Sequence, residues 1–304
     1  MSALLTFIPA VIIIIGLGWF FKRTGFLPAG SVDILNKIII YVSLPALIFL
    51  AVQQTDISLS VTKFPLYAAA VMLVCLALSF GLGKLLKLKN SLLGAFLITA
   101  AIGNTGYIGF PLTIGLFGQG ELVKSVFYDF GTVVVLFTIG IMIAGYFGDP
   151  EHKMNVFKEF ATFPSVIALV LGLVCNPLTL PHFAVTTLEY LSLANVPLVM
   201  LTVGLTLESK AIGRYAAPLA AMIAVKLMVS PVVAFLAGTA GSLSGTNLGI
   251  IVLEASMPAV MLSLVVGLKY KLDVEFISLA IVVSIIASLA TIPATQALMH
   301  LLAA

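Results

Sequence analysis

Charged side chains are scarce in this sequence of 304 residues. Only 9% of the residues are Asp, Glu, Lys or Arg, whereas a soluble domain carries about 25%. Apolar residues make up 61% of the chain. Because there is too little charge to cover a surface in water, the composition excludes an ordinary soluble protein. The net charge of +3 is too small to indicate nucleic-acid binding.

Cysteine and histidine are almost absent as well. Cys75 and Cys175 lie inside apolar runs and are interpreted as small core residues rather than a disulfide or a metal pair. His152, His182 and His300 lie in loops or at the terminus without helical spacing, which argues against a metal centre. The sequence also lacks a phosphate-binding glycine loop and a Ser with a nearby His and Asp. We therefore expect neither an enzyme nor a bound cofactor.

Long apolar runs, by contrast, are abundant. A bilayer core of about 30 Å requires roughly 20 apolar residues per helix, and an all-α integral membrane protein with ten spans is predicted. The first run has no positive start and no cleavage site, so it is interpreted as a retained span rather than a signal peptide. The predicted spans are 3–21, 32–52, 63–86, 91–118, 121–147, 159–180, 185–207, 214–238, 245–267 and 274–302.

The basic residues predict which side of the membrane each loop occupies. Lys and Arg accumulate on the cytoplasmic face, and with ten spans the loops of one face contain twelve of them and those of the other face only two, Lys63 and Lys124. A cell-membrane protein with both termini on the non-cytoplasmic side is therefore expected. The twelve are Lys22, Arg23, Lys37, Lys84, Lys87, Lys89, Lys153, Lys158, Lys210, Arg214, Lys269 and Lys271.

Similar residues recur at similar positions in the two halves of the chain, 147 to 152 residues apart. We interpret residues 1–150 and 151–304 as two five-helix repeats. Because five is odd, the second repeat enters the membrane inverted relative to the first, as in many secondary transporters. The recurring pairs are Ser43 with Asn195, Pro45 with Pro197, and Pro111 with Pro258.

Predicted span four carries an unusual central stretch, from Gly103, Asn104, Thr105 and Gly106 to Pro111. Glycine weakens a helix and proline removes a backbone donor, so the stretch predicts a break. Unpaired backbone groups survive in a membrane only where protein or a water-filled cavity surrounds them. The alternative is a continuous helix that is merely kinked.

Predicted span nine contains a corresponding stretch with Glu254, Ser256, Met257 and Pro258. Ends of broken helices offer N–H groups to anions and C=O groups to cations. We therefore expect substrate at Gly103, Asn104, Gly106, Pro111, Ser256, Met257, Pro258 and Lys226.

Three ionisable residues, Asp129, Lys226 and Glu254, fall deep inside predicted spans. Each costs about 2.5 to 3.5 kcal/mol at a helix centre on insertion scales, so such residues usually serve a function. Thr132 is on the same helix face as Asp129. Lys226 is expected to neutralise a carboxylate or to attract an anion, and buried structural ion pairs are the alternative. A coupling ion, Na⁺ or H⁺, is expected at Asn104, Thr105, Asp129, Thr132 and Glu254.

The stretch from Gly103 to Pro111, together with Met257, Pro258 and Ala259, resembles the auxin efflux carrier family of the bile acid, arsenite and riboflavin transporter superfamily. The resemblance extends over essentially the whole chain and is closest to prokaryotic-type members. It implies a bile acid sodium symporter/NhaA-like fold, in which broken helices four and nine cross at Pro111 and Pro258.

The same resemblance implies elevator-type alternating access, with spans 1, 2, 6 and 7 as a scaffold and spans 3–5 and 8–10 as a moving transport domain. It also implies a homodimer through the scaffold, with Pro45 and Pro197 near the contact, and a small organic anion such as a carboxylate or an auxin-like compound. Glu254 departs from the plant members, is shared with sodium-coupled bile-acid-type relatives, and favours cation coupling.

The leading hypothesis is a secondary active transporter of a small organic anion, coupled to Na⁺ or H⁺. One alternative is an ion-independent uniporter or a channel, in which the buried charges line a pore or brace the fold. Another is an intramembrane enzyme, which the lack of a nucleophile with a base disfavours.

Overall fold

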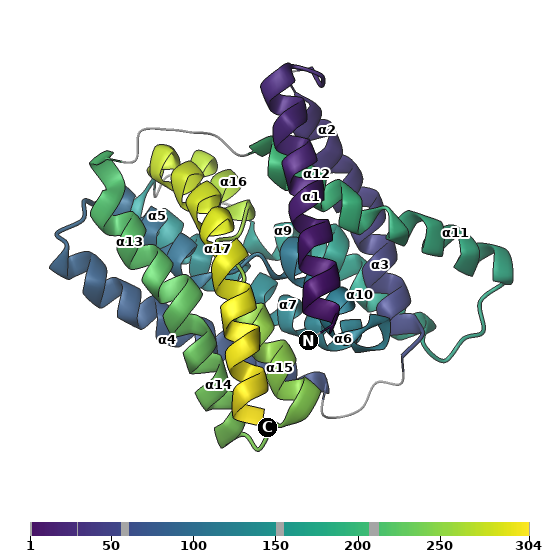
Figure 1. The fold of residues 1–304 in the computed structure, drawn as a ribbon. Coiled ribbons are helices and arrows are strands. Elements are labelled where there is room, and N and C mark those ends of the chain that lie inside the picture. Colours follow the sequence, from purple (N-terminus) through teal and green to yellow (C-terminus); the bar gives the residue numbers. More distant parts are fainter. Residues whose placement is uncertain (1, 29, 56–60, 150–154, 207–212, 304) are drawn as a thin grey trace. The chain divides into compact units, whose positions relative to one another are not determined.

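The computed structural model describes residues 2–28, 30–55, 61–149, 155–206 and 213–303, and helices dominate them (Figure 1). Each of the ten predicted spans coincides with helical segments. Within the described ranges, six segments are long and apolar enough to cross a membrane: Ser31–Gln53, Val61–Leu85, Gln119–Phe147, His182–Thr206, Gly213–Ala240 and Val274–Met299. Shorter apolar helices are Asn90–Ala101, Thr105–Phe117, Pro164–Cys175 and Gly245–Ala255.

These helices form because lipid offers no partners to backbone N–H and C=O groups, which must therefore bond within the segment.

The chain forms two compact units. The number of spans, their inverted repeat and their sidedness stay predictions. Lys153, Lys210 and the predicted repeat boundary between residues 150 and 151 lie outside the described residues, as does His152.

The first unit comprises Met1–Val61, Gly106–Val126 and Ala161–Glu208. Its helices α1 and α12 lie side by side (Figure 1). A Cβ atom on Gly18 of α1 would lie 2.2 Å from the Leu201 carbonyl oxygen, and one on Gly204 of α12 would lie 2.0 Å from that of Ile15. Glycine is therefore required for this close contact. The helices of this unit are α1 (Ser2–Thr24), α2 (Ser31–Ile38), α3 (Leu44–Gln53), α6 (Phe110–Phe117), α10 (Pro164–Cys175), α11 (His182–Leu193) and α12 (Asn195–Thr206).

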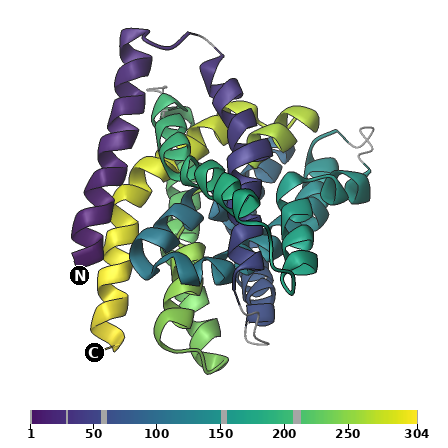
Figure 2. The same cartoon turned by 90° about the vertical axis from the view of Figure 1, so that its right-hand side faces the viewer.

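The second unit comprises Thr62–Thr105, Phe127–Phe160 and Ser209–Ala304. Its longest helix, α17, contains 30 residues and is yellow in Figure 2. The α7 helix begins in the first unit's segment and lies mostly in the second. The helices are α4 (Phe64–Leu85), α5 (Asn90–Ala101), α7 (Leu122–Val135), α8 (Ile141–Phe147), α9 (Val156–Ala161), α13 (Ala216–Ile223), α14 (Ser230–Ala240), α15 (Gly245–Ala255), α16 (Leu262–Lys269) and α17 (Val274–Ala303).

Several prolines stand in the first turn of a helix, where the missing N–H would have no partner in any case. Pro45 in α3 and Pro231 in α14 each follow a π-helical turn, Ile39–Ser43 and Ala224–Val229 respectively. A π-helical turn takes up the mismatch that a proline creates in a continuing helix. The turn before Pro231 contains Lys226, so this proline fixes the local backbone of a predicted site residue.

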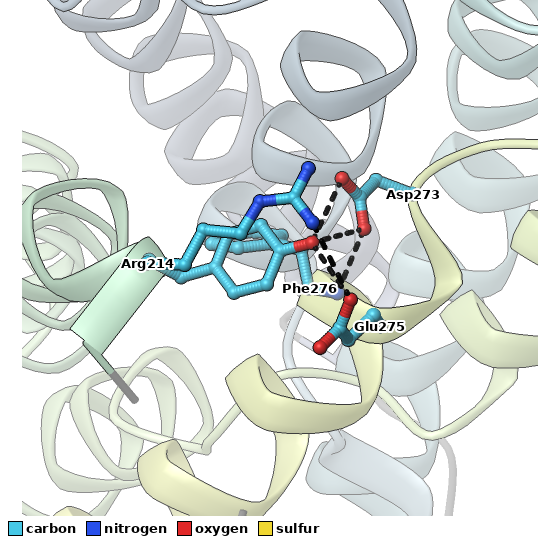
Figure 3. Close-up of polar contacts among 5 residues, drawn as sticks. Arg214, Asp273, Glu275 and Phe276 are labelled. Atoms are coloured by element: carbon cyan, nitrogen blue, oxygen red, sulfur yellow. Dashed lines mark hydrogen bonds and ion pairs between the residues drawn. The ribbon is translucent and has the colours of Figure 1, made fainter. Parts of the chain in front are cut away.

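A polar cluster at one end of the second unit joins the start of α13 to the start of α17 (Figure 3). The hydroxyl of Tyr215 donates to Asp273 at 3.1 Å and lies 3.2 Å from Glu275. Asp273 also accepts a bond from the backbone N–H of Phe276 at 3.0 Å, which caps α17. Arg214 lies 3.8 Å from Glu275, but both side chains are exposed, so this ion pair contributes little to stability. The cluster joins the start of α17 to the start of the helical segment that leads to Lys226, in the π-helical turn after α13.

Candidate functional site at the crossing of two interrupted helices

Both predicted breaks are present. After α5 the chain is extended at Ile102, and a π-helical turn from Thr105 to Gly109 precedes α6. After α15 the chain leaves the helix and becomes helical again at α16. The alternative of a continuous kinked helix, which was raised for span four, is therefore wrong, and span nine is interrupted as well. Each break interrupts a segment that would otherwise be long enough to span the membrane.

The two breaks meet within the second unit and bond to each other, and residues 102–104 and 258–260 are called the crossing from here on. The backbone N–H of Asn104 donates to the carbonyl of Pro258 at 2.8 Å, and that of Val260 donates to the carbonyl of Ile102 at 3.1 Å. Gly103 and Ala259 form an isolated antiparallel bridge between these two bonds. Each half-helix thus satisfies backbone groups that the other one releases, as burial in a membrane requires.

The crossing differs in one respect from the arrangement that the family resemblance implied. Pro258 is at the crossing, but on the first segment the crossing residues are Gly103 and Asn104 rather than Pro111. Pro111 instead lies in the first turn of α6, where a proline is readily accommodated. Gly106 and Pro111 belong to the first unit, whereas the other predicted site residues belong to the second.

Asn104 presents an unpartnered donor at the crossing. Its side chain is 3% exposed, and no group of the described structure accepts a bond from Nδ2. A buried amide N–H without a partner costs about 1 to 3 kcal/mol, so it commonly marks a place for a ligand or a water molecule. Asn104 is therefore suited to bind an acceptor oxygen.

Thr105 and Asp129 meet beside the crossing. The Thr105 hydroxyl donates to Asp129 Oδ1 at 2.5 Å, and both side chains are buried. The α7 helix, which carries Asp129, packs closely on α4. A Cβ atom on Gly131 of α7 would lie only 2.6 Å from the carbonyl oxygen of Pro65 in α4. Thr132, although also buried, donates to the Tyr128 carbonyl of its own helix at 3.3 Å. The sequence analysis assigned Thr105 and Asp129 to one ion site, and the structure places the two side chains in contact; their role in ion binding stays a prediction.

Lys226 reaches the end of α15. Its Nζ atom donates to the carbonyl of Ala255 at 2.9 Å and to the hydroxyl of Ser230 at 3.3 Å, and Ser230 itself donates to Ala255 at 2.8 Å. Glu254, which precedes Ala255 in α15, is fully buried. The buried cation therefore lies at a helix terminus and a hydroxyl, which together reduce the cost of its burial.

The remaining predicted residues of span nine are buried at the same break. Ser256 donates to the carbonyl of Val252 at 2.6 Å and so continues the last turn of α15, while Met257 is fully buried. The described part of the chain contains no group of three or more His, Cys, Asp or Glu side chains suited to a metal ion. The oxygen atoms at the crossing come instead from hydroxyls, carboxylates and backbone carbonyls.

Two residues at the crossing were missed by the sequence analysis. Ser284 of α17 accepts a bond from the backbone N–H of Ala259 at 3.1 Å, and Ser230 shares Ala255 with Lys226. Ser284 lies 155 residues after Asp129, close to the spacing of the other repeat pairs, and Ser230 lies one helical turn after Lys226. The repeat spacing of Ser284 and the helical spacing of Ser230 can both be found in the sequence. Serine is common in these spans, however, so neither residue stands out.

A cavity of about 360 Å³ is located elsewhere in the second unit, among α14, α15 and α17. It contains none of the predicted site residues. Its walls are almost entirely apolar and are formed by Leu227, Met228, Pro231, Val232, Phe235, Val252, Thr291, Ala294, Thr295, Leu298 and Met299.

Comparison with known proteins identifies the class of the molecule. The sequence model of the family described as "Membrane transport protein" matches residues 4–295. The chain belongs to this family. This confirms the resemblance to the auxin efflux carrier family that the motifs indicated, and it makes the chain a multi-pass membrane transporter.

Relatives of this family member are similar along nearly their whole length. An uncharacterized transporter of Methanocaldococcus jannaschii is 33% identical over 295 residues, which cover 93% of this chain and 94% of the relative. One of Methanothermobacter thermautotrophicus is 31% identical over 287 residues, with coverage of 93% and 94%. A protein of Rhizobium meliloti named "Putative malonate transporter" is 26% identical over 290 residues, with coverage of 92% and 90%.

Proposed function

We propose that this protein is a secondary active transporter that moves a small organic anion across the membrane by elevator-type alternating access, coupled to Na⁺ or H⁺. The observation that carries the proposal is the crossing of two interrupted helices, lined by the buried polar side chains of Asn104, Thr105, Asp129, Lys226 and Glu254, in a chain of a transporter family. Transporters bind substrates and ions at such discontinuous helices.

A carboxylate is the substrate class that best suits the groups at this site. The unpartnered Nδ2 atom of Asn104 is a donor, and Lys226 supplies positive charge nearby. A carboxylate offers two acceptor oxygens and a negative charge, and bonds to charged acceptors are the stronger ones. The name of the Rhizobium meliloti relative refers to malonate, a small dicarboxylate, and supports the same class.

The proposed coupling group is Asp129 with Thr105, close to Asn104. Oxygen ligands are those that Na⁺ requires, and a buried carboxylate can alternatively exchange a proton. Thr132 and Glu254 complete the oxygen-rich set of the proposal. Because Asp129 already bonds Thr105, cation binding and the conformation of the span-four break are expected to depend on each other.

The division of the chain supports the proposed scaffold and transport domains. The first unit contains the helices of spans 1, 2, 6 and 7 with α6, and the second contains most of the remainder. Two hydrogen bonds at similar positions in the two halves support the inverted repeat. The Thr105 hydroxyl donates to Asp129, and the backbone N–H of Ala259 donates to Ser284. These bonds match Thr105 with Ala259 and Asp129 with Ser284, at spacings of 154 and 155 residues, whereas Pro111 and Pro258 are 147 apart.

A homodimer through the scaffold remains part of the proposal. Large apolar side chains of α11 are exposed on the first unit, among them Phe183 at 75% and Tyr190 at 72%. Such surfaces in a membrane protein are covered by lipid or by another subunit. Crosslinking between single cysteines introduced at Phe183 or Tyr190 in membranes is expected to yield a dimer, and an absence of crosslinks at the scaffold positions would argue for a monomer.

The function is tested with purified protein in two steps. Thermal unfolding in detergent with a panel of mono- and dicarboxylates, with and without Na⁺, is expected to show stabilisation by at least one small carboxylate, because a ligand that binds only the folded state raises its stability. Uptake of that compound into proteoliposomes is then expected to exceed equilibration when a Na⁺ or proton gradient is imposed. Uptake that stops at equilibration under both gradients would favour the uniporter or channel.

A further inference from the structure

The C-terminal end of α15 has an unusual partner. Terminal carbonyl groups of a helix lack partners within the helix and carry partial negative charge. In α15 the last carbonyl, that of Ala255, accepts bonds from both Lys226 Nζ and Ser230 of the neighbouring span. Exposed carbonyl ends of broken helices are the groups that hold coupling cations in other transporters.

The ammonium group of Lys226 also lies against the other interrupted helix. A Cβ atom added to Gly103 would be 3.1 Å from both Cε and Nζ of Lys226. Since the side chain of Lys226 is only 2% exposed, its charge is held at the crossing rather than in solvent. The carboxyl-bearing residue Glu254 directly precedes Ala255 at this end of α15 and is fully buried. The ammonium group of Lys226 is thus surrounded by groups that would attract a mobile cation if Lys226 were absent.

We propose that Lys226 is a tethered cation, whose ammonium group takes the position of a mobile coupling ion at the carbonyl end of α15. The inference rests on the proposed function and narrows it. A substrate anion meets a positive charge that stays with the protein, and any Na⁺ or H⁺ that is coupled to transport binds on the Asp129 and Thr105 side of the crossing.

The test replaces the tethered cation by a free one. Lys226→Ala removes the ammonium group and opens a space that leads to the Ala255 carbonyl. We expect the variant to unfold at a lower temperature than the wild type, and methylammonium chloride to restore much of the difference in a saturable manner. Choline chloride, whose cation is too large for this space, is expected to have no such effect at equal ionic strength.

Matched variants distinguish a specific site from a general salt effect. Lys226→Met fills the same space without charge and is expected not to respond to methylammonium. Lys84→Ala, which removes an exposed lysine of α4, is expected to behave as the wild type. An equal response of the wild type, Lys226→Ala and Lys226→Met to methylammonium would overturn the proposal.

Two further variants separate the effect of charge from that of shape if Lys226→Ala does not fold. Lys226→Arg retains the positive charge but differs in shape, whereas Lys226→Met is closer to lysine in volume. The arginine variant is expected to unfold at the higher temperature, and the reverse order or equality would contradict a tethered cation.

These thermal unfolding measurements are made in the absence of substrate. If methylammonium rescues Lys226→Ala while the wild type transports no carboxylate, the tethered cation stands and the proposed transport function fails. If carboxylate uptake is observed without rescue or an advantage of arginine, the function stands and the tethered cation is refuted.

Discussion

The side-chain amide of Asn195 donates a hydrogen bond to the hydroxyl of Ser43 at 3.4 Å, across 152 residues of sequence. Both side chains are buried in the first unit. Each stands two residues before a proline, Pro45 or Pro197, and the two positions form one of the repeat pairs found in the sequence. Equivalent residues of two repeats contact each other only close to the pseudo-two-fold axis that relates the repeats, so the bond supports the proposed inverted repeat.

Replacement of Asn104 by Ala is expected to weaken carboxylate binding about ten- to a hundredfold. The substitution removes the unpartnered buried donor at the crossing, and a bond to a charged group contributes about 1.5 to 3 kcal/mol. Titration of the stabilising carboxylate in a thermal-shift assay measures the effect. Asn90→Ala, at an exposed position at the start of α5, serves as the control, and wild-type affinity of Asn104→Ala would remove Asn104 from the site.

Replacement of Asp129 by Asn is expected to abolish stimulation of uptake by the coupling ion while the protein stays folded. The amide oxygen can still accept the bond from Thr105, but the negative charge is lost. Uptake into proteoliposomes with and without the ion gradient measures the effect. Asp33→Asn alters an exposed carboxylate of α2 and should leave stimulation intact. Unchanged ion dependence in both Asp129→Asn and Glu254→Gln would refute the coupling assignment.

Replacement of Gly103 by Ala is expected to destabilise the protein by about 1 to 3 kcal/mol, the usual range for overpacking a core. The new Cβ atom would lie 3.1 Å from Lys226 Nζ and 3.4 Å from the Met257 carbonyl oxygen. Thermal or chemical unfolding in detergent provides the measurement. Gly16→Ala, where an added Cβ atom meets nothing within 4 Å, is the matched control. Equal stability of the two variants would mean that the side chains around Gly103 leave room for a methyl group.

Replacement of Tyr215 by Phe is expected to cost about 1 kcal/mol of stability. The substitution removes only the hydroxyl group, which forms hydrogen bonds with Asp273 and Glu275. The same unfolding assay applies, with Tyr146→Phe as the control, since Tyr146 is 80% exposed. A melting temperature equal to that of the wild type would show that the cluster in Figure 3 does not contribute measurably to the joining of α13 and α17.

Several features of the candidate site could be predicted from the sequence because they follow from local chemistry. Glycine and proline weaken a helix wherever they occur in it, so the breaks near Gly103 and Pro258 were predictable. Ionisable residues are costly in any apolar segment, which singled out Asp129, Lys226 and Glu254. The position of the crossing on span four was not predictable, since a proline such as Pro111 is compatible with either a break or the start of a helix.

Composition and the spacing of apolar residues by themselves determined that this is a helical membrane protein with interrupted helices, because the solvent of a residue and the cost of a backbone break are properties of the local chain. Only the tertiary structure decided which distant groups meet. The bond between Lys226 and Ala255, the pairing of Asn104 with Pro258 and the unpartnered amide of Asn104 depend on how helices from different parts of the chain pack, and no local pattern specifies that packing.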